Sequence, residues 1–163
     1  PTHKFMDDTT ITEILAASQP SLMHLYFQQL VDWTLTNSMQ INENKTKEMV
    51  ITTSHAVSIP PFPSIGRVSS FKILGVIVSN NLKWTEHVHY ISAKANSRLH
   101  FLKQLKRAGL SNDDILHFYL AVIRPVLEYA APVWHSSLTN ELSDQLESLQ
   151  KRAMHHFWLP QSY

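Results

Sequence analysis

Hydrophobic and polar positions alternate irregularly in the first half of the chain and take up helical spacing from about residue 84 onwards. Steps of three and four residues then separate the apolar positions Trp84, Val88, Ile91, Ala95, Leu99, Leu102 and Leu105. Such spacing is typical of the buried face of a helix, and a glycine such as Gly109 is common just beyond a helix end. The pattern therefore predicts a long helix over residues 84–107.

Two more helices are predicted after it. Ser111, with Asp114 three residues later, fits the capping box that opens a helix. That helix is expected to bend or break at Pro125, because proline lacks a backbone N–H, and to resume over residues 126–134. The last helix is expected to start near Thr139 and to bury Leu142, Leu146, Leu149, Ala153 and Phe157.

The first half mixes short strands with one helix. Residues 1–18 alternate partially around an acidic pair and predict a hairpin. Ser18 and Pro20 are typical helix-start residues, and the helix that follows is expected to end at Asn37 and Ser38. One face of this helix carries Leu22, Tyr26, Leu30 and Trp33.

Two strands and a proline-rich loop complete this half. One strand is predicted around Met49–Ile51. Residues 55–67 hold three of the eight prolines and predict a loop. Residues 68–79 predict a single strand, in which Gly75 marks a bulge or a close backbone approach.

The chain is therefore expected to fold as an α+β protein, with a small mixed unit over residues 1–83 and an all-helical unit over residues 84–163. Apolar residues make up 44% of the sequence, enough for a core, and charged residues only 17%, which is low for a disordered segment. The net charge of +1 gives no global attraction to nucleic acid or to a membrane. The absence of cysteine excludes disulfides, thiolate zinc sites and a cysteine nucleophile.

Membrane partners and a signal peptide are not expected. No apolar run approaches the ~18–20 residues of a bilayer span, and the N-terminus lacks the basic-then-apolar pattern of a signal peptide. The chain opens without a methionine and within a few residues of its acidic pair, so we expect a fragment of a longer protein.

Five motifs follow one another in an informative order. They are Phe5-Met6-Asp7-Asp8; LVDWTLTNSMQIN with Asn44-Lys45-Thr46-Lys47; Phe71-Lys72-Ile73-Leu74-Gly75-Val76; Leu82-Lys83-Trp84 with His87; and Ile123-Arg124-Pro125 through Leu127-Glu128-Tyr129 and Trp134 to Leu149-Gln150-Lys151-Arg152-Ala153. Together they resemble the carboxy-terminal part of a reverse transcriptase from a non-LTR (LINE-like) retrotransposon. The resemblance covers nearly the whole chain and implies a partial palm followed by a helical thumb and connection.

The resemblance implies an RNA-directed DNA polymerase that performs two-metal nucleotidyl transfer in the intact parent enzyme, on an RNA template and a DNA primer. Mg²⁺ prefers carboxylate oxygens together with waters and phosphates. In the family, Asp7 is the firmer metal ligand and Asp8 a weaker or outer one, and both are catalytic. Taken alone, an Asp-Asp pair in a turn is usually solvated. Met6 departs from the alanine more usual in LINE-like enzymes, which leaves the clade open.

Lysines and a glycine complete the implied polymerase site. The resemblance places Lys45 opposite the incoming triphosphate, where a lysine neutralises charge or donates a proton. Lys47 beside it is a candidate nucleic-acid contact; the alternative is a solvated lysine pair. Gly75 lies in the hairpin that grips the primer in the family.

The helix over residues 84–107 is strongly basic, with five cations against Glu86, or 5 − 1 = +4. A thumb helix uses such residues on the phosphates of a template–primer duplex, a contact that ignores sequence and weakens with salt. The alternative is an ordinary solvated helix face. The candidate nucleic-acid contacts are Lys94, Arg98, Lys103, Lys106 and Arg107.

One departure from the family concerns activity. The family's metal site also needs an aspartate from an earlier palm strand, and none of that region lies in these 163 residues. We therefore expect no polymerase activity from this chain alone. The alternative function is a non-catalytic nucleic-acid-binding or protein-binding helical module. The family copies RNA at chromosomal sites, so an intracellular, nuclear location is expected.

A second resemblance is excluded on chemical grounds. The stretch IRPVLEYAAPVWHSSLT resembles an amino-terminal segment of AlkB-homologue dioxygenases, whose iron site needs two histidines and a carboxylate, two of them as His-x-Asp. None of the ten histidines has an aspartate two residues later, so dioxygenase activity is not supported. His87 and His89 do not share a helix face, and no histidine metal site is expected. The tryptophans are expected to be packing anchors.

Overall fold

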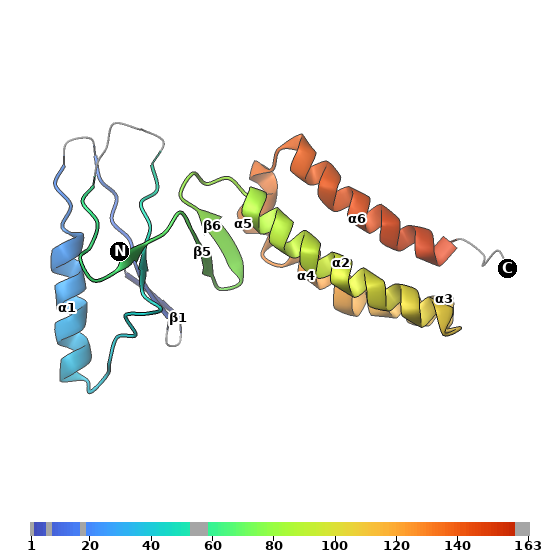
Figure 1. Cartoon of the computed structure of the whole chain (residues 1–163), viewed down its shortest axis with the longest axis horizontal. Coiled ribbons are helices and arrows are strands. Elements are labelled where there is room, and N and C mark those ends of the chain that lie inside the picture. Colours follow the sequence, from blue (N-terminus) through green and yellow to red (C-terminus); the bar gives the residue numbers. More distant parts are fainter. Residues whose placement is uncertain (1, 6–7, 17–18, 53–58, 159–163) are drawn as a thin grey trace. The chain divides into compact units, whose positions relative to one another are not determined.

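The computed structural model describes residues 2–5, 8–16, 19–52 and 59–158. The fold is mixed α+β, as the sequence predicts, and the chain divides into two compact units, Pro1–Phe71 and Lys72–Tyr163 (Figure 1). This division falls before the boundary predicted at residue 83, because strand β6 (Val76–Ser79) packs on helix α2 (Thr85–Arg107) of the second unit. Among the described residues, no helix is both long enough and apolar enough to cross a membrane.

The first unit begins with the predicted hairpin. Strands β1 (Thr2–Phe5) and β2 (Asp8–Ile11) pair antiparallel, with Phe5 opposite Asp8. Helix α1 (Met23–Thr36) follows and ends at Asn37 as predicted, although it starts later than the predicted Ser18–Pro20 signal.

The strand predicted around Met49–Ile51 is wrong in position. Strand β3 (Lys47–Glu48) precedes those residues and pairs in parallel with β4 (Gly66–Arg67). Next to this pair, Val68 donates its N–H to the Glu48 carbonyl (2.9 Å).

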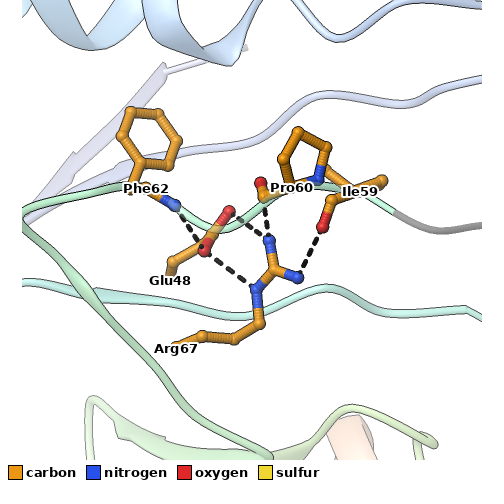
Figure 2. Close-up of polar contacts among 5 residues, drawn as sticks. All are labelled: Glu48, Ile59, Pro60, Phe62 and Arg67. Carbon is orange, nitrogen blue, oxygen red and sulfur yellow. Dashed lines mark hydrogen bonds and ion pairs between the residues drawn. The ribbon is translucent and has the colours of Figure 1, made fainter.

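The proline-rich loop is held by a carboxylate–guanidinium pair, which Figure 2 shows in close-up. Arg67 Nε and Nη2 donate to the two carboxylate oxygens of Glu48 at 2.9 and 3.0 Å, a bidentate arrangement. The same guanidinium donates to the carbonyls of Ile59 (2.7 Å) and Pro60 (3.0 Å), and Glu48 accepts the Phe62 N–H (3.4 Å). One ion pair therefore joins β3 and β4 to the loop that connects them.

Packing in the first unit is thin. Phe62 contacts Phe27 of α1, with ring centroids 5.5 Å apart. Among the described hydrophobic residues of this unit, only Ile65 is buried. Much of the predicted apolar face of α1 is exposed, and Trp33 is 47% accessible.

The second unit begins inside a hairpin, where a single strand was predicted. Strands β5 (Ser70–Ile73) and β6 pair as a two-stranded sheet, and Leu74 and Gly75 form the turn. Both turn residues have positive φ, 45° and 89°, as a type I′ turn requires. The predicted strand over 68–79 is therefore wrong, because its glycine serves a tight turn rather than a bulge.

The helices of this unit form three rods along the chain, which can be followed in Figure 1. The first is α2. The second comprises α3 (Asn112–Phe118), the π-helical segment η1 (Tyr119–Ile123) and α4 (Arg124–Glu128). After the short α5 (Ala131–Trp134) and the 3₁₀ turn η2 (His135–Ser137), α6 (Asn140–Trp158) is the third. The helix start predicted at Ser111 is confirmed, since Ser111 Oγ accepts the Asp114 N–H (3.2 Å) and donates to the Asp114 carboxylate (2.6 Å).

The prediction at Pro125 was a bend or a break, and the helix does not break there. The π-helical turn immediately before Pro125 widens the backbone, and the Arg124 N–H bonds to the Tyr119 carbonyl instead of one residue nearer. The rod breaks later, where Ala130 adopts φ 52° between α4 and α5.

The hydrophobic core lies in the second unit, on the faces that the sequence predicts for the long helices. Trp134 is 1% accessible, and its Nε1–H donates to the Tyr129 carbonyl (2.9 Å), which confirms one tryptophan as a packing anchor. The side chain of Phe157, predicted to be buried, lies outside the described residues. The core comprises Val76, Val88, Ile91, Ala95, Leu99, Leu102, Ile115, Tyr119, Ile123, Leu127, Trp134, Leu142, Leu146, Leu149 and Ala153.

Candidate functional site

The acidic hairpin presents one described carboxylate. Asp8 is exposed and opens β2, directly after the tip, while Asp7 lies outside the described residues. A carboxylate is the donor type that Mg²⁺ prefers, so Asp8 fits the implied metal chemically. Within the described ranges, no three histidine, aspartate or glutamate side chains gather where they could hold a metal ion. A metal role for this pair therefore stays a prediction.

The two candidate lysines lie in the first unit. Lys45 is exposed in a turn after α1, where its N–H donates to the carbonyl of Asn42 (3.1 Å). Lys47 is exposed at the start of β3, opposite Gly66. Both ammonium groups are accessible for an anionic ligand, and no described contact tests the triphosphate role.

Gly75 has a protein neighbour at close range. A Cβ at this position would lie 2.9 Å from Cε1 of Tyr129, closer than real side chains approach. Tyr129 Oη–H also donates to the Leu74 carbonyl (2.9 Å). The close approach that the sequence predicts at Gly75 is therefore confirmed, and its partner is a tyrosine of the break between α4 and α5.

His87 connects the β5–β6 hairpin to α2. Its ring is buried, and Nδ1 accepts the Ile77 N–H (3.2 Å) from β6. Burial lowers the pKa of the imidazole, so the neutral form is favoured. Trp84 and Trp134 lie edge-on to this ring, and Nε2 has no hydrogen-bond partner among the described residues.

Lys94 belongs to a small cationic cluster with Lys72 and Tyr90. Lys72 Nζ donates to Tyr90 Oη (2.7 Å), and the two ammonium groups lie 4.6 and 5.4 Å from the tyrosine ring centroid. The hydrogen bond from Lys72 is the main cause of a lowered pKa for the Tyr90 hydroxyl. The ammonium groups of Lys72 on β5 and Lys94 on α2, both exposed residues, therefore lie close to the same tyrosine ring.

Arg98 has a structural partner. It is half-buried, and Nη1 donates to the carbonyl of Val122 within the π-helical segment. A guanidinium bonded to the backbone is less available for phosphate than an exposed one. The structure therefore gives Arg98 a role in joining α2 to η1, while its predicted nucleic-acid role is untested.

The remaining cations of α2 do not share the face of Lys94. Nine residues at about 100° each place Lys103 about 180° around the helix from Lys94. Lys106 and Arg107 lie in the last turn, where positive charge complements the helix dipole. The five basic residues of α2 are thus distributed around the helix, and no single duplex can contact all of them through α2 alone.

Three residues near these candidates were missed from the sequence. Lys72 stands in the strand that precedes the Leu-Gly turn, and Lys151 and Arg152 lie between the buried positions Leu149 and Ala153 of α6. Cations that flank an apolar stripe border a helix–helix contact, and this spacing was the available signal.

The chain matches no protein-family model, no curated protein and no solved structure.

Proposed function

We propose that this chain is part of a reverse transcriptase of the LINE-like type, in which it contributes the acidic palm hairpin, the primer-gripping hairpin and the thumb. In the intact parent, Mg²⁺ held in part by Asp7 and Asp8 supplies charge neutralisation for nucleotidyl transfer. The chain alone is expected to be inactive, since one hairpin offers only part of a two-metal site.

One observation carries the proposal: both motifs expected at hairpin tips coincide with hairpins. Asp8 opens the strand after the tip of the β1–β2 hairpin, and Leu74-Gly75 is the two-residue turn between β5 and β6. Leu74 has φ 45° and is 48% accessible. A non-glycine residue in this conformation costs of order 1–3 kcal/mol and is often found at ligand-contacting sites.

The nucleic-acid contact in this proposal is electrostatic. Lys72 and Lys94, together at Tyr90, are directed to the phosphates of a template–primer duplex. Lysine contacts of this kind are independent of sequence and release counterions, so they weaken steeply with salt.

A hybrid-binding experiment tests the contact. Fluorescence anisotropy measures binding of the full chain to an RNA–DNA hybrid between about 50 and 200 mM salt. We expect Lys94→Glu to weaken binding about tenfold, while Lys83→Glu, an equal charge change at an exposed residue before α2, changes it less than about twofold. Equal effects of the two variants, or no hybrid binding at low salt, would remove the proposed contact.

A primer-extension assay tests the inactivity. Incorporation on an RNA template in Mg²⁺, above the level of an Asp7→Ala, Asp8→Ala control, would contradict the expectation for the isolated chain. The alternative binding-module function predicts hybrid affinity that the same double variant leaves unchanged, together with no extension. The observation that supports this alternative function is that the described core belongs to the helical unit and not to the unit that contains the acidic hairpin.

A further inference from the structure

A groove in the second unit gathers positive charge on the side of α2 opposite Lys94. Its volume is about 440 Å³. Helix α2 lines it with His100 and Lys103, and α6 lines it with Lys151, Arg152 and His155. Lys103 follows His100 by three positions, and His155 follows Lys151 by four and Arg152 by three, so these spacings place the residues of each helix near the same space.

The two walls are held at a fixed register. Gln145 Nε2 of α6 donates to Ser92 Oγ of α2 (3.3 Å). Farther along, Arg152 Nη2 donates to Asn96 Oδ1 (2.8 Å). The partners advance together along both helices, so α2 and α6 run side by side in the same direction, which can be followed in Figure 1.

Most of the charge in the groove is not neutralised. Arg152 bonds to an amide oxygen, and Lys103 makes no ion pair within the described part of the chain. Only Lys151 meets a carboxylate, Glu147 at 3.1 Å, and both side chains are well exposed, so this pair is weak. The net charge of these groups, counting Lys103, Lys151, Arg152 and Glu147, is 3 − 1 = +2.

We propose that this groove binds one strand of nucleic acid through its phosphates. The inference rests on the proposed function for the class of ligand, and it adds a second contact that differs in kind from the duplex contact at Lys94. The groove volume of about 440 Å³ is in the size range of small-ligand sites, so it admits a short segment of one sugar–phosphate strand but not a duplex.

The imidazoles favour the same occupant. His100 and His155 place aromatic rings among the cations of the groove. Single-stranded nucleic acid is recognised by basic grooves that follow its backbone and by aromatic side chains on which its unpaired bases stack. A small inorganic anion would use the charge but not the rings.

The test compares two probes on the full chain. Fluorescence anisotropy measures binding of a single-stranded oligo(U) RNA of about ten nucleotides beside the RNA–DNA hybrid. Lys103→Glu reverses one charge in the groove, Lys83→Glu makes the same change outside it, and Lys94→Glu alters the duplex contact. All three positions are exposed, and circular dichroism establishes that each variant is folded.

We expect Lys103→Glu to weaken single-strand binding about tenfold and to make its salt dependence shallower by about one to two phosphate contacts, with hybrid binding changed less than about twofold. Equal weakening of both probes by Lys103→Glu would overturn the inference. So would equal single-strand effects of Lys103→Glu and Lys83→Glu, or no single-strand binding by the unmodified chain.

The same data separate the two proposals. Hybrid binding that depends on Lys94, without single-strand binding, overturns the groove and leaves the template–primer contact standing. Single-strand binding that depends on Lys103, without hybrid binding, supports the groove and removes the template–primer contact.

Discussion

At the scale of single residues, Gly75 joins two parts of the second unit that are far apart in sequence. It has positive φ, and the ring of Tyr129 covers the position of its missing side chain. Gly109 also has positive φ (83°), but no described atom lies within 4 Å of the Cβ it would carry. Comparing the same substitution at the two glycines therefore separates the cost of backbone strain from the cost of a steric clash.

We predict that Gly75→Ala destabilises the chain more than Gly109→Ala does. An alanine in the left-handed region costs about 1–2 kcal/mol at either site, and the clash with Tyr129 adds about 1–3 kcal/mol at residue 75. Urea unfolding measures both variants. In a Tyr129→Leu background the difference should shrink; equal costs in the native background would show that the Tyr129 ring yields freely.

The sequence could show that Gly75 needs a close approach, because a glycine inside an apolar run is unusual. It could not show the partner, since Tyr129 follows a helix break whose position depends on tertiary packing. The distribution of the basic residues around α2, by contrast, could be predicted from the sequence. Their angles around α2 follow from about 100° per residue, so the sequence already separates Lys94 from Lys103.

At the scale of elements, the rod formed by α3, η1 and α4 depends on its neighbour α2. Regular α-helical hydrogen bonding is interrupted through η1, and Arg98 of α2 donates to a carbonyl of this segment, that of Val122. A carbonyl left without a donor is costly in a partly buried position. Arg98 thus connects the irregular turn to the longest helix.

We predict that Arg98→Met lowers the free energy of unfolding by about 1–3 kcal/mol, because it removes this donor while keeping most of the side-chain stem. Arg107→Met, which removes a charge from the exposed last turn of α2, should cost less than about 1 kcal/mol. Thermal unfolding measures both. Unchanged stability with weakened hybrid binding would instead support the phosphate contact predicted for Arg98.

The long helices were predictable because their apolar stripes repeat over many turns. Helix α2 and the buried face of α6 follow those stripes. Local sequence rules did not anticipate the π turn before Pro125, and the helix continues through this residue without a break. The short β3 and β4 carry too few residues for any periodic signal, and Glu48 and Arg67 join them through a contact across the loop.

At the scale of the whole molecule, the two units differ in how well they are packed. The contiguous core belongs to the second unit, whereas the first buries Ile65 alone among its described hydrophobic residues and exposes Trp33 and Leu35. Stability follows buried apolar area, so local opening should be easiest in the first unit.

We predict that limited proteolysis of the full chain leaves a resistant fragment beginning near Lys72. Mass spectrometry of a thermolysin time course identifies its ends. Leu102→Ala, which removes a fully buried side chain at a cost of about 2–5 kcal/mol, should reduce the lifetime of that fragment. Equal persistence of both units would contradict the prediction.

The π-helical turn also sets the rotational phase between α3 and α4. Ile115, Tyr119, Ile123 and Leu127 are all buried at intervals of four residues. In a regular α-helix each interval overshoots a full turn by about 40°, so three intervals would carry Leu127 about 120° away from Ile115. The wider turn in η1 holds more residues per revolution, so each residue rotates the chain by a smaller angle and part of the 120° rotation is cancelled.

A deletion within α4 is therefore not a neutral shortening of a helix. A one-residue loss within η1 can be absorbed, because the wide turn then becomes regular α-helix, but the same loss in α4 rotates everything after it by about 100°, taking Leu127 out of the core and the Tyr129 ring away from Gly75. The hairpin would then lose its cover even though none of its own residues had changed. The number of residues in this segment therefore matters for the core and for the hairpin contact as much as the identity of the residues does.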